Sequence, residues 1–286
     1  MSVLIFIKDL LIATLGQMAV LFGGVTAAGL LLHLVSHLTY KSLENAFGSK
    51  GVFAVAWLGT PVHELGHAIF CPIFMHRIEE MQLFHPNPAT GTLGYVNHTW
   101  DRRNPWAVMG NFFIGIGPVI MDGAVLFGLF YWLVPGSRDI GNIGAGLPVS
   151  GDSLIWKGYL DIFTDASLAV SGLLFTPDNL LTWQFWLFLY LAVCISSSLR
   201  LSVADIRTAA SGLGMTVLPF LVLNLIGMLT GSGDNGWLSW MASYLGTGYG
   251  VLVLALVPGM AGLVIVYLIS AAWYRIRYRR VLNPFR

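Results

Sequence analysis

The sequence predicts an all-α polytopic membrane protein, with about six transmembrane helices and a small β-hairpin at the membrane interface. Hydrophobic residues make up 56% of the 286 residues and charged residues only 10%, whereas soluble domains average about 45–50% and about 25%. Apolar stretches of about 20 residues, the length that crosses a bilayer, recur along the chain. Two strand-like runs, separated by turn residues, follow the second of these stretches. We therefore interpret residues 1–286 as a single integral membrane domain.

The apolar stretches define the expected helices, which cover residues 4–35, 51–74, 106–134, 181–199, about 202–230, and 249–274. Residues 36–50 are expected to form a short polar loop between the first two helices. Residues 136–178 are glycine-rich and acidic, and we interpret them as an ordered extracytoplasmic loop with one or two short interfacial helices. Pro61, Pro118 and Pro219 fall inside expected helices and predict local kinks or breaks.

The strand-like runs predict a β-hairpin. EEMQLF at residues 79–84 and GTLGYVNHT at residues 91–99 are separated by the turn-forming residues HPNPAT. We expect this hairpin to lie at the membrane interface or to dip into it, where its edge could pair with an extended peptide. The alternative interpretation of these residues is a plain cytosolic loop.

The second expected helix carries ionisable residues in the pattern H-E-x-x-H, at His63, Glu64 and His67. Such groups at bilayer depth cost about 2.5–3.5 kcal/mol each, so they indicate a functional site. Residues four apart lie on one face of a helix, so the two imidazoles can bind one zinc ion. Glu64 lies about 100° further around the helix, where a general base for a zinc-activated water belongs. The alternative is a buried polar cluster that packs against other helices.

A catalytic zinc ion usually takes three protein ligands, and a carboxylate commonly joins two histidines. We expect Asp205 to be the third metal ligand, because it lies at a helix start among small residues that permit close approach. Asp205 also completes an S-x-x-D pattern with Ser202, so helix capping is an alternative role. Asp122, at membrane depth in the third helix, is the other candidate ligand. His76, His85 and His98 are spare ligand candidates without an assigned role. His33 and His37, four residues apart near the end of the first helix, could form a second metal site, but we interpret them as interfacial histidines.

The chain resembles the site-2 protease family of intramembrane zinc metalloproteases. HELGHA at residues 63–68 matches the helix motif of that family residue by residue. GTLGYV at residues 91–96 and GIGPV at residues 115–119 resemble the membrane-embedded sheet and the glycine-proline segment of the family.

This resemblance implies that His63 and His67 bind Zn²⁺, that Glu64 is the catalytic base, and that a later helix supplies the third ligand. The core metalloprotease region then covers about residues 51–230. The Asp-Gly pair that the family usually carries is absent at Asp205, which an isoleucine follows.

These features predict an intramembrane zinc metalloprotease that hydrolyses peptide bonds of membrane-spanning or juxtamembrane substrates. Its partners are then a membrane protein or peptide substrate and the lipid bilayer. The sequence has no basic-aromatic array, so no nucleic-acid partner is expected. The main alternative is a non-proteolytic zinc-binding membrane protein, either a transporter or a sensor. A zinc hydrolase that acts on lipid or prenylated substrates is a further alternative.

The distribution of basic residues predicts the orientation in the membrane. Six spans place both termini on one side, and we expect that side to be the cytosol. This assignment leaves only Lys41, Lys50, Arg138 and Lys157 of the 15 lysines and arginines outside, in agreement with the positive-inside rule. The protein is thus expected to be a multi-pass protein of the plasma or inner membrane, with the metal site in the cytosolic half of the bilayer.

Overall fold

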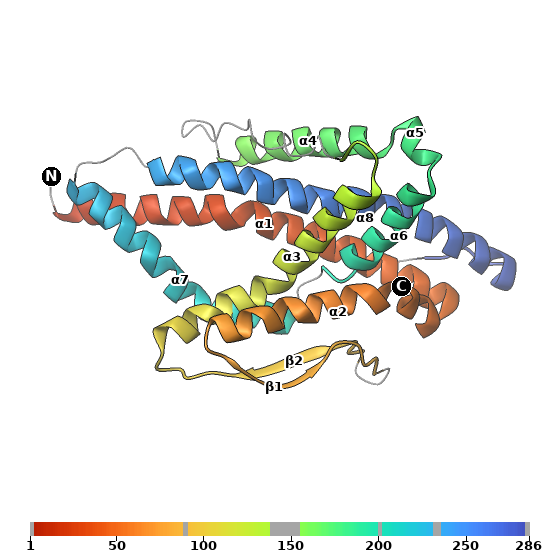
Figure 1. Cartoon of the computed structure of the whole chain (residues 1–286), viewed down its shortest axis with the longest axis horizontal. Helices are drawn as coiled ribbons and strands as arrows, with labels where there is room; N and C mark the ends of the chain where they lie inside the picture. The colour runs from red at the N-terminus through yellow and green to blue at the C-terminus, as the bar shows by residue number, and fades with distance from the viewer. Residues whose placement is uncertain (1–2, 88–90, 138–154, 200–201, 231–235, 284–286) are drawn as a thin grey trace.

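The computed structural model of the chain describes residues 3–87, 91–137, 155–199, 202–230 and 236–283. This part of the chain is mostly helical, with a small two-stranded sheet (Figure 1). In chain order the elements are α1 (Val3–Phe47), α2 (Ser49–Ile73), β1 (Arg77–Gln82), β2 (Tyr95–Thr99), α3 (Pro105–Leu133), α4 (Ile155–Leu174), α5 (Pro177–Leu180), α6 (Trp183–Ser196), α7 (Val203–Thr230) and α8 (Gly236–Tyr278). The predicted helical architecture with a small hairpin is therefore confirmed.

Four helices in the described part of the chain are long and apolar enough to cross a membrane. They are α1, α3, α7 and the segment Leu252–Tyr278 of α8. The other two expected spans, in α2 and α6, are not among them. The ionisable residues of the motif make α2 less apolar, and α6 has only 14 residues, whereas about 20 are needed to span.

The long helices α1 and α8 lie side by side and run in the same direction, whereas α3 and α7 lie obliquely to them (Figure 1). The main apolar core lies among α1, α3, α4, α6 and α8. Its fully buried side chains include Leu32, Phe130, Val170, Phe188 and Leu254. This core holds the C-terminal half of α3, and the other half of α3 contacts α2 and α7.

Glycines bring α2, α3 and α7 together around the motif. A Cβ atom on Gly66 of α2 would lie 2.6 Å from the Cα atom of Pro118 in α3. A Cβ atom on Gly115 of α3 would lie 2.6 Å from the backbone nitrogen of Ala209 in α7. Larger residues at Gly66 or Gly115 would push the helices apart, because packed interiors leave no room for such contacts. The contacts at Gly66 and Gly115 together bring the start of α7 up to the motif.

The polar loop predicted for residues 36–50 is wrong. Helix α1 continues to Phe47 and α2 begins at Ser49, with Gly48 between them at a φ of 65°. The hydroxyls of Thr39 and Ser42 donate hydrogen bonds to carbonyl oxygens four residues earlier, so these polar side chains are satisfied within the helix. Helices α2, α3 and α7 are continuous through Pro61, Pro118 and Pro219, so none of these prolines breaks its helix.

The interpretation of residues 136–178 is partly corrected. Residues 138–154 lie outside the described residues. The remainder contains α4, a helix of 20 residues, and the short helix α5. Helix α4 lies alongside α8 (Figure 1), and its side chains Ala166, Val170 and Leu174 are buried in the main core. Helix α4 is therefore part of the packed helical body.

The hairpin is confirmed, and the alternative of a plain loop is wrong. β1 and β2 pair antiparallel, with Arg77 opposite Thr99 and Gln82 opposite Tyr95. The pairing is irregular between Ile78 and Glu80, as in a β-bulge. The hairpin lies alongside α2 (Figure 1), so one of its strands runs past the motif.

Candidate metal centre

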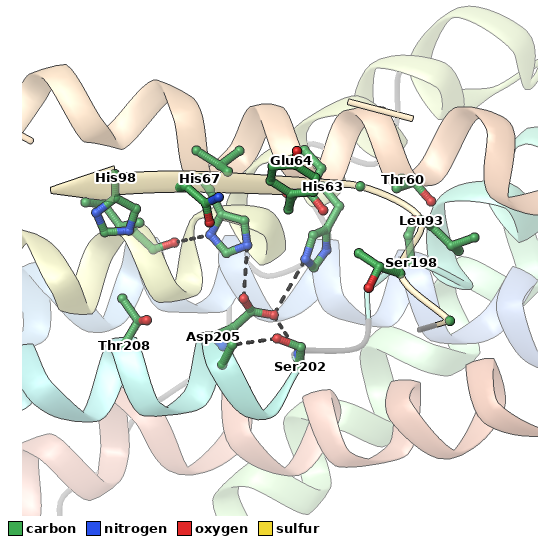
Figure 2. A pocket seen from close by; sticks show the side chains of 18 of the residues that line it. Thr60, His63, Glu64, His67, Leu93, His98, Ser198, Ser202, Asp205 and Thr208 are labelled. Carbon is green, nitrogen blue, oxygen red and sulfur yellow. Dashed lines mark hydrogen bonds and ion pairs between the residues drawn. The ribbon is translucent and has the colours of Figure 1, made fainter. Parts of the chain in front are cut away.

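Two helices bring three metal-ligating side chains together. His63 and His67 extend from α2, and Asp205 extends from the first turn of α7 (Figure 2). Nε2 of His67 lies 3.1 Å from Oδ1 of Asp205, and Nε2 of His63 lies 3.7 Å from Oδ2 of Asp205. One ligand atom from each residue lies within 4.8 Å of the other two. All three residues are buried, with 8–9% of their surface exposed. This group can hold a metal ion.

The second nitrogen of each imidazole has its own partner. Nδ1 of His67 lies 2.8 Å from the carbonyl oxygen of Ile114 in α3. Because a carbonyl oxygen only accepts, Nδ1 of His67 carries the proton and its Nε2 lone pair faces Asp205. Nδ1 of His63 lies 3.8 Å from Oδ2 of Asp122, also in α3. Such outer partners orient metal-binding histidines in known metal sites.

Asp122 is not one of the three grouped ligands. It is fully buried, and neither of its oxygens has a hydrogen-bond partner among the described residues. Nδ1 of His63, the nearest charged or ionisable partner, also lacks a hydrogen bond there. A buried carboxylate without a partner is costly. A cation bound at Nε2 of His63 would polarise the ring and strengthen the attraction between its Nδ1–H and the Asp122 carboxylate. The structure therefore favours Asp205 as the third ligand and places Asp122 behind His63.

Asp205 has both of the roles that the sequence left open. Its Oδ2 accepts a hydrogen bond of 2.6 Å from the backbone N–H of Ser202, and the Ser202 hydroxyl accepts one of 3.1 Å from the backbone N–H of Asp205. This is a reciprocal capping arrangement at the start of α7. The cap fixes the carboxylate while Oδ1 remains directed at His67. Capping and metal binding are therefore compatible.

The donor set fits a catalytic zinc site. Two imidazole nitrogens and one carboxylate are a common protein ligand set for catalytic zinc, which keeps a fourth position open. The orientation of both rings by Ile114 and Asp122 fits the same use, because each ring turns Nε2 towards Asp205.

Glu64 lies next to the metal group without belonging to it. The side chain is buried, with 8% of its surface exposed, and it lines the same cavity as His63 and His67. A Cβ atom on Gly94, just before β2, would lie 2.9 Å from Cγ of Glu64. Only a glycine lets the chain pass this close to Glu64, so the hairpin covers the catalytic candidate directly.

The site opens into a cavity of about 480 Å³ that lies between α2, the start of α7 and residues 91–98, which lead into β2 and form most of it. Sequence reasoning missed several of its lining residues, because small hydroxyl side chains carry no motif: Thr60, Ser198 and Thr208. It also left His98 without a role, although His98 lines this cavity. His33, His37, His76 and His85 are not among the described lining residues.

Comparisons of the chain with protein-family models, with characterised proteins and with solved structures gave no match.

Proposed function

We propose that this protein is an intramembrane zinc metalloprotease, similar in chemistry to the site-2 protease family. The observation that supports this most is the convergence of His63, His67 and Asp205 beside the free carboxylate of Glu64. A metal-binding group alone needs no such carboxylate. A hydrolase needs one, because a water must lose its proton before it attacks a carbonyl carbon.

In the proposed reaction, Zn²⁺ would supply a Lewis acid that polarises the scissile carbonyl and lowers the pKa of the attacking water. Glu64 accepts the proton of that water and returns it to the leaving amine. The carbonyl of Ile114 holds the His67 ring in the required tautomer, and the carboxylate of Asp122, 3.8 Å from Nδ1 of His63, favours a proton on that nitrogen. The Ser202 backbone holds the Asp205 carboxylate in place.

The strand β2 supports a peptide as the substrate. The cavity is lined by residues 91–98, whereas no residue of β1 lines it. The edge of β2 that does not pair with β1 is therefore the edge next to the cavity. An unwound peptide can add to such an edge through main-chain hydrogen bonds, which exposes its carbonyls to the site. A transmembrane helix must unwind to be cut, because its carbonyls are otherwise hydrogen-bonded internally.

The Glu64→Gln variant tests this function. We expect it to bind as much zinc as the wild type in elemental analysis, but to cleave membrane-anchored test peptides at least a hundred-fold more slowly. Glu44→Gln, on α1 away from the cavity lining, is the matched control and should cleave normally. Full cleavage by Glu64→Gln would refute the mechanism. Zinc flux into liposomes that does not depend on Glu64 would instead support a transporter.

We propose a multi-pass orientation in which the arginine-rich end of α8 is cytosolic, because Arg275 and Arg277 occupy its last turn. The expectation that the N-terminus shares this side remains a prediction. The parallel course of α1 and α8 supports termini on opposite sides if each helix crosses the bilayer once. Reporter fusions at each end would distinguish the two arrangements.

A further inference from the structure

Two histidines outside the metal group form a chain of hydrogen bonds that ends at the cavity. His76, between α2 and β1, is buried, and its Nε2 lies 2.8 Å from the carbonyl oxygen of Ala107 in α3. Nδ1 of His76 lies 2.9 Å from Nδ1 of His98 in β2. The ring of Trp100 stacks on His76, with ring centroids 5.2 Å apart and planes 14° apart. These contacts fix the position of both imidazole rings.

The carbonyl at the buried end determines where the protons lie. Because a carbonyl oxygen only accepts, His76 donates its Nε2–H to Ala107, and in a neutral ring its Nδ1 is then an acceptor. His98 therefore donates its Nδ1–H to His76, and a neutral His98 carries a lone pair on Nε2.

Both rings are expected to be neutral near pH 7. Burial lowers the pKa of His76, although its hydrogen bond to Ala107 opposes the effect. Burial, together with the nearby His76 and His67, lowers the pKa of His98 to about 4. The chain of hydrogen bonds thus leaves one unprotonated nitrogen, Nε2 of His98.

His98 lies at one end of the cavity. His98 lies beside His67, on the side away from His63, and Thr208 of α7 lies near the same end (Figure 2). Leu93 lies towards the opposite end (Figure 2). Nδ1 of His98 is used by His76, and no described residue makes a hydrogen bond to Nε2. The residue that carries the unprotonated nitrogen therefore lines the His67 end of the cavity, and an apolar side chain lies towards the other end.

We propose that His98 forms a substrate subsite whose Nε2 accepts a hydrogen bond from a donor side chain of the bound peptide, on the His67 side of the scissile bond. This inference rests on the proposed protease function and specifies its substrate class. A peptide strand added to β2 uses its main-chain groups for pairing with β2, so a side chain supplies the donor. The favoured substrates carry a hydroxyl or amide side chain at this position.

The preference follows from the cost of an unpaired acceptor. An aliphatic side chain that covers Nε2 removes water from it without replacing the hydrogen bond. Valine and threonine side chains have the same shape, so we expect a peptide with valine at this position to bind about five- to ten-fold more weakly than the same peptide with threonine. His98 is thus a specificity-determining residue rather than a base.

The protonation pattern can be measured without any activity. Nitrogen-15 NMR of histidine-labelled protein in nanodiscs should show His98 as the Nδ1–H tautomer and His76 as the Nε2–H tautomer near pH 7. A His98 ring that is protonated on Nε2 would overturn the proposal. The variant His76→Phe removes the acceptor and should release His98 to a mixture of tautomers.

The subsite itself is tested by peptide binding to the Glu64→Gln protein, which cannot cleave. The probes are membrane-anchored peptides of one apolar sequence in which a single valine is replaced by threonine at successive positions. One position should bind about five- to ten-fold tighter with threonine. His98→Asn should abolish this difference, because its amide can still donate to His76 but lacks the second nitrogen. His85→Asn, elsewhere in the hairpin, should retain it.

The outcomes separate this subsite from the protease function. A threonine preference that depends on His98, without hydrolysis by the wild type, would refute the protease function and leave the subsite standing. Hydrolysis by the wild type with no threonine preference at any position would refute the subsite alone. A preference that persists in His98→Asn would also refute it.

Discussion

Replacing Asp122 by asparagine is expected to weaken metal binding although Asp122 is not a ligand. Oδ2 of Asp122 lies 3.8 Å from Nδ1 of His63, and the carboxylate is fully buried. A full unit charge on the imidazole would interact with the carboxylate by about 4 kcal/mol at an effective dielectric constant of 20. Because a metal-bound ring carries only part of that charge and asparagine keeps an acceptor, we expect a smaller loss.

The expected loss is about 10- to 100-fold in metal affinity, which corresponds to about 1.4–2.7 kcal/mol. Competition with a chelator of known zinc affinity, on protein purified in detergent, measures it directly. Asp161→Asn, on the exposed face of α4, removes the same charge away from the site and should leave the affinity unchanged. An Asp122→Asn affinity within two-fold of the wild type would refute the role of Asp122 as the orienting partner of His63.

Three further predictions follow from the packing around the site. Gly66→Leu should separate α2 from α3, so that thermal stability and zinc content both fall, whereas Gly128→Leu, where a Cβ meets no atom within 4 Å, should change neither. Ser202→Ala removes the cap of α7, so it should cost about 1 kcal/mol of stability and reduce zinc affinity. The exposed control Ser211→Ala should change neither, and equal stability and zinc affinity in the two variants would contradict this prediction. The pKa of His98 is lowered from 6.5 to about 4 in the folded protein, so the unfolded chain binds more protons between these pH values. The hairpin should therefore lose stability as the pH falls from about 6.5 to 4. Hydrogen exchange in the hairpin measures this loss, which His98→Asn should reduce.

Local spacing was sufficient to predict the two histidines and Glu64. Their geometry depends only on the pitch of one helix, which the surrounding fold does not alter. The choice between Asp205 and Asp122 could not be settled from the sequence, because it depends on how α3 and α7 pack on α2. The glycine contacts that decide it join residues that are far apart in the chain.

The errors in the fold have related physical causes. Residues 36–50 contain many polar side chains, which favoured a loop, but the hydroxyls of Thr39 and Ser42 bond to their own helix and Tyr40 and Leu43 pack against α2. The role of His98 was missed because its partner His76 is 22 residues away. The pairing of β1 with β2 brings the two rings together, and no periodic pattern in the sequence predicts which residues of the two strands lie opposite each other.

The most direct test of the central claim is the zinc content of purified protein variants. The account predicts one zinc ion per chain in the wild type and in His85→Ala, and a strong loss of zinc in His67→Ala and in Asp205→Ala. Equal zinc content in all four proteins, or no zinc in the wild type, would contradict a metal centre formed by α2 and α7.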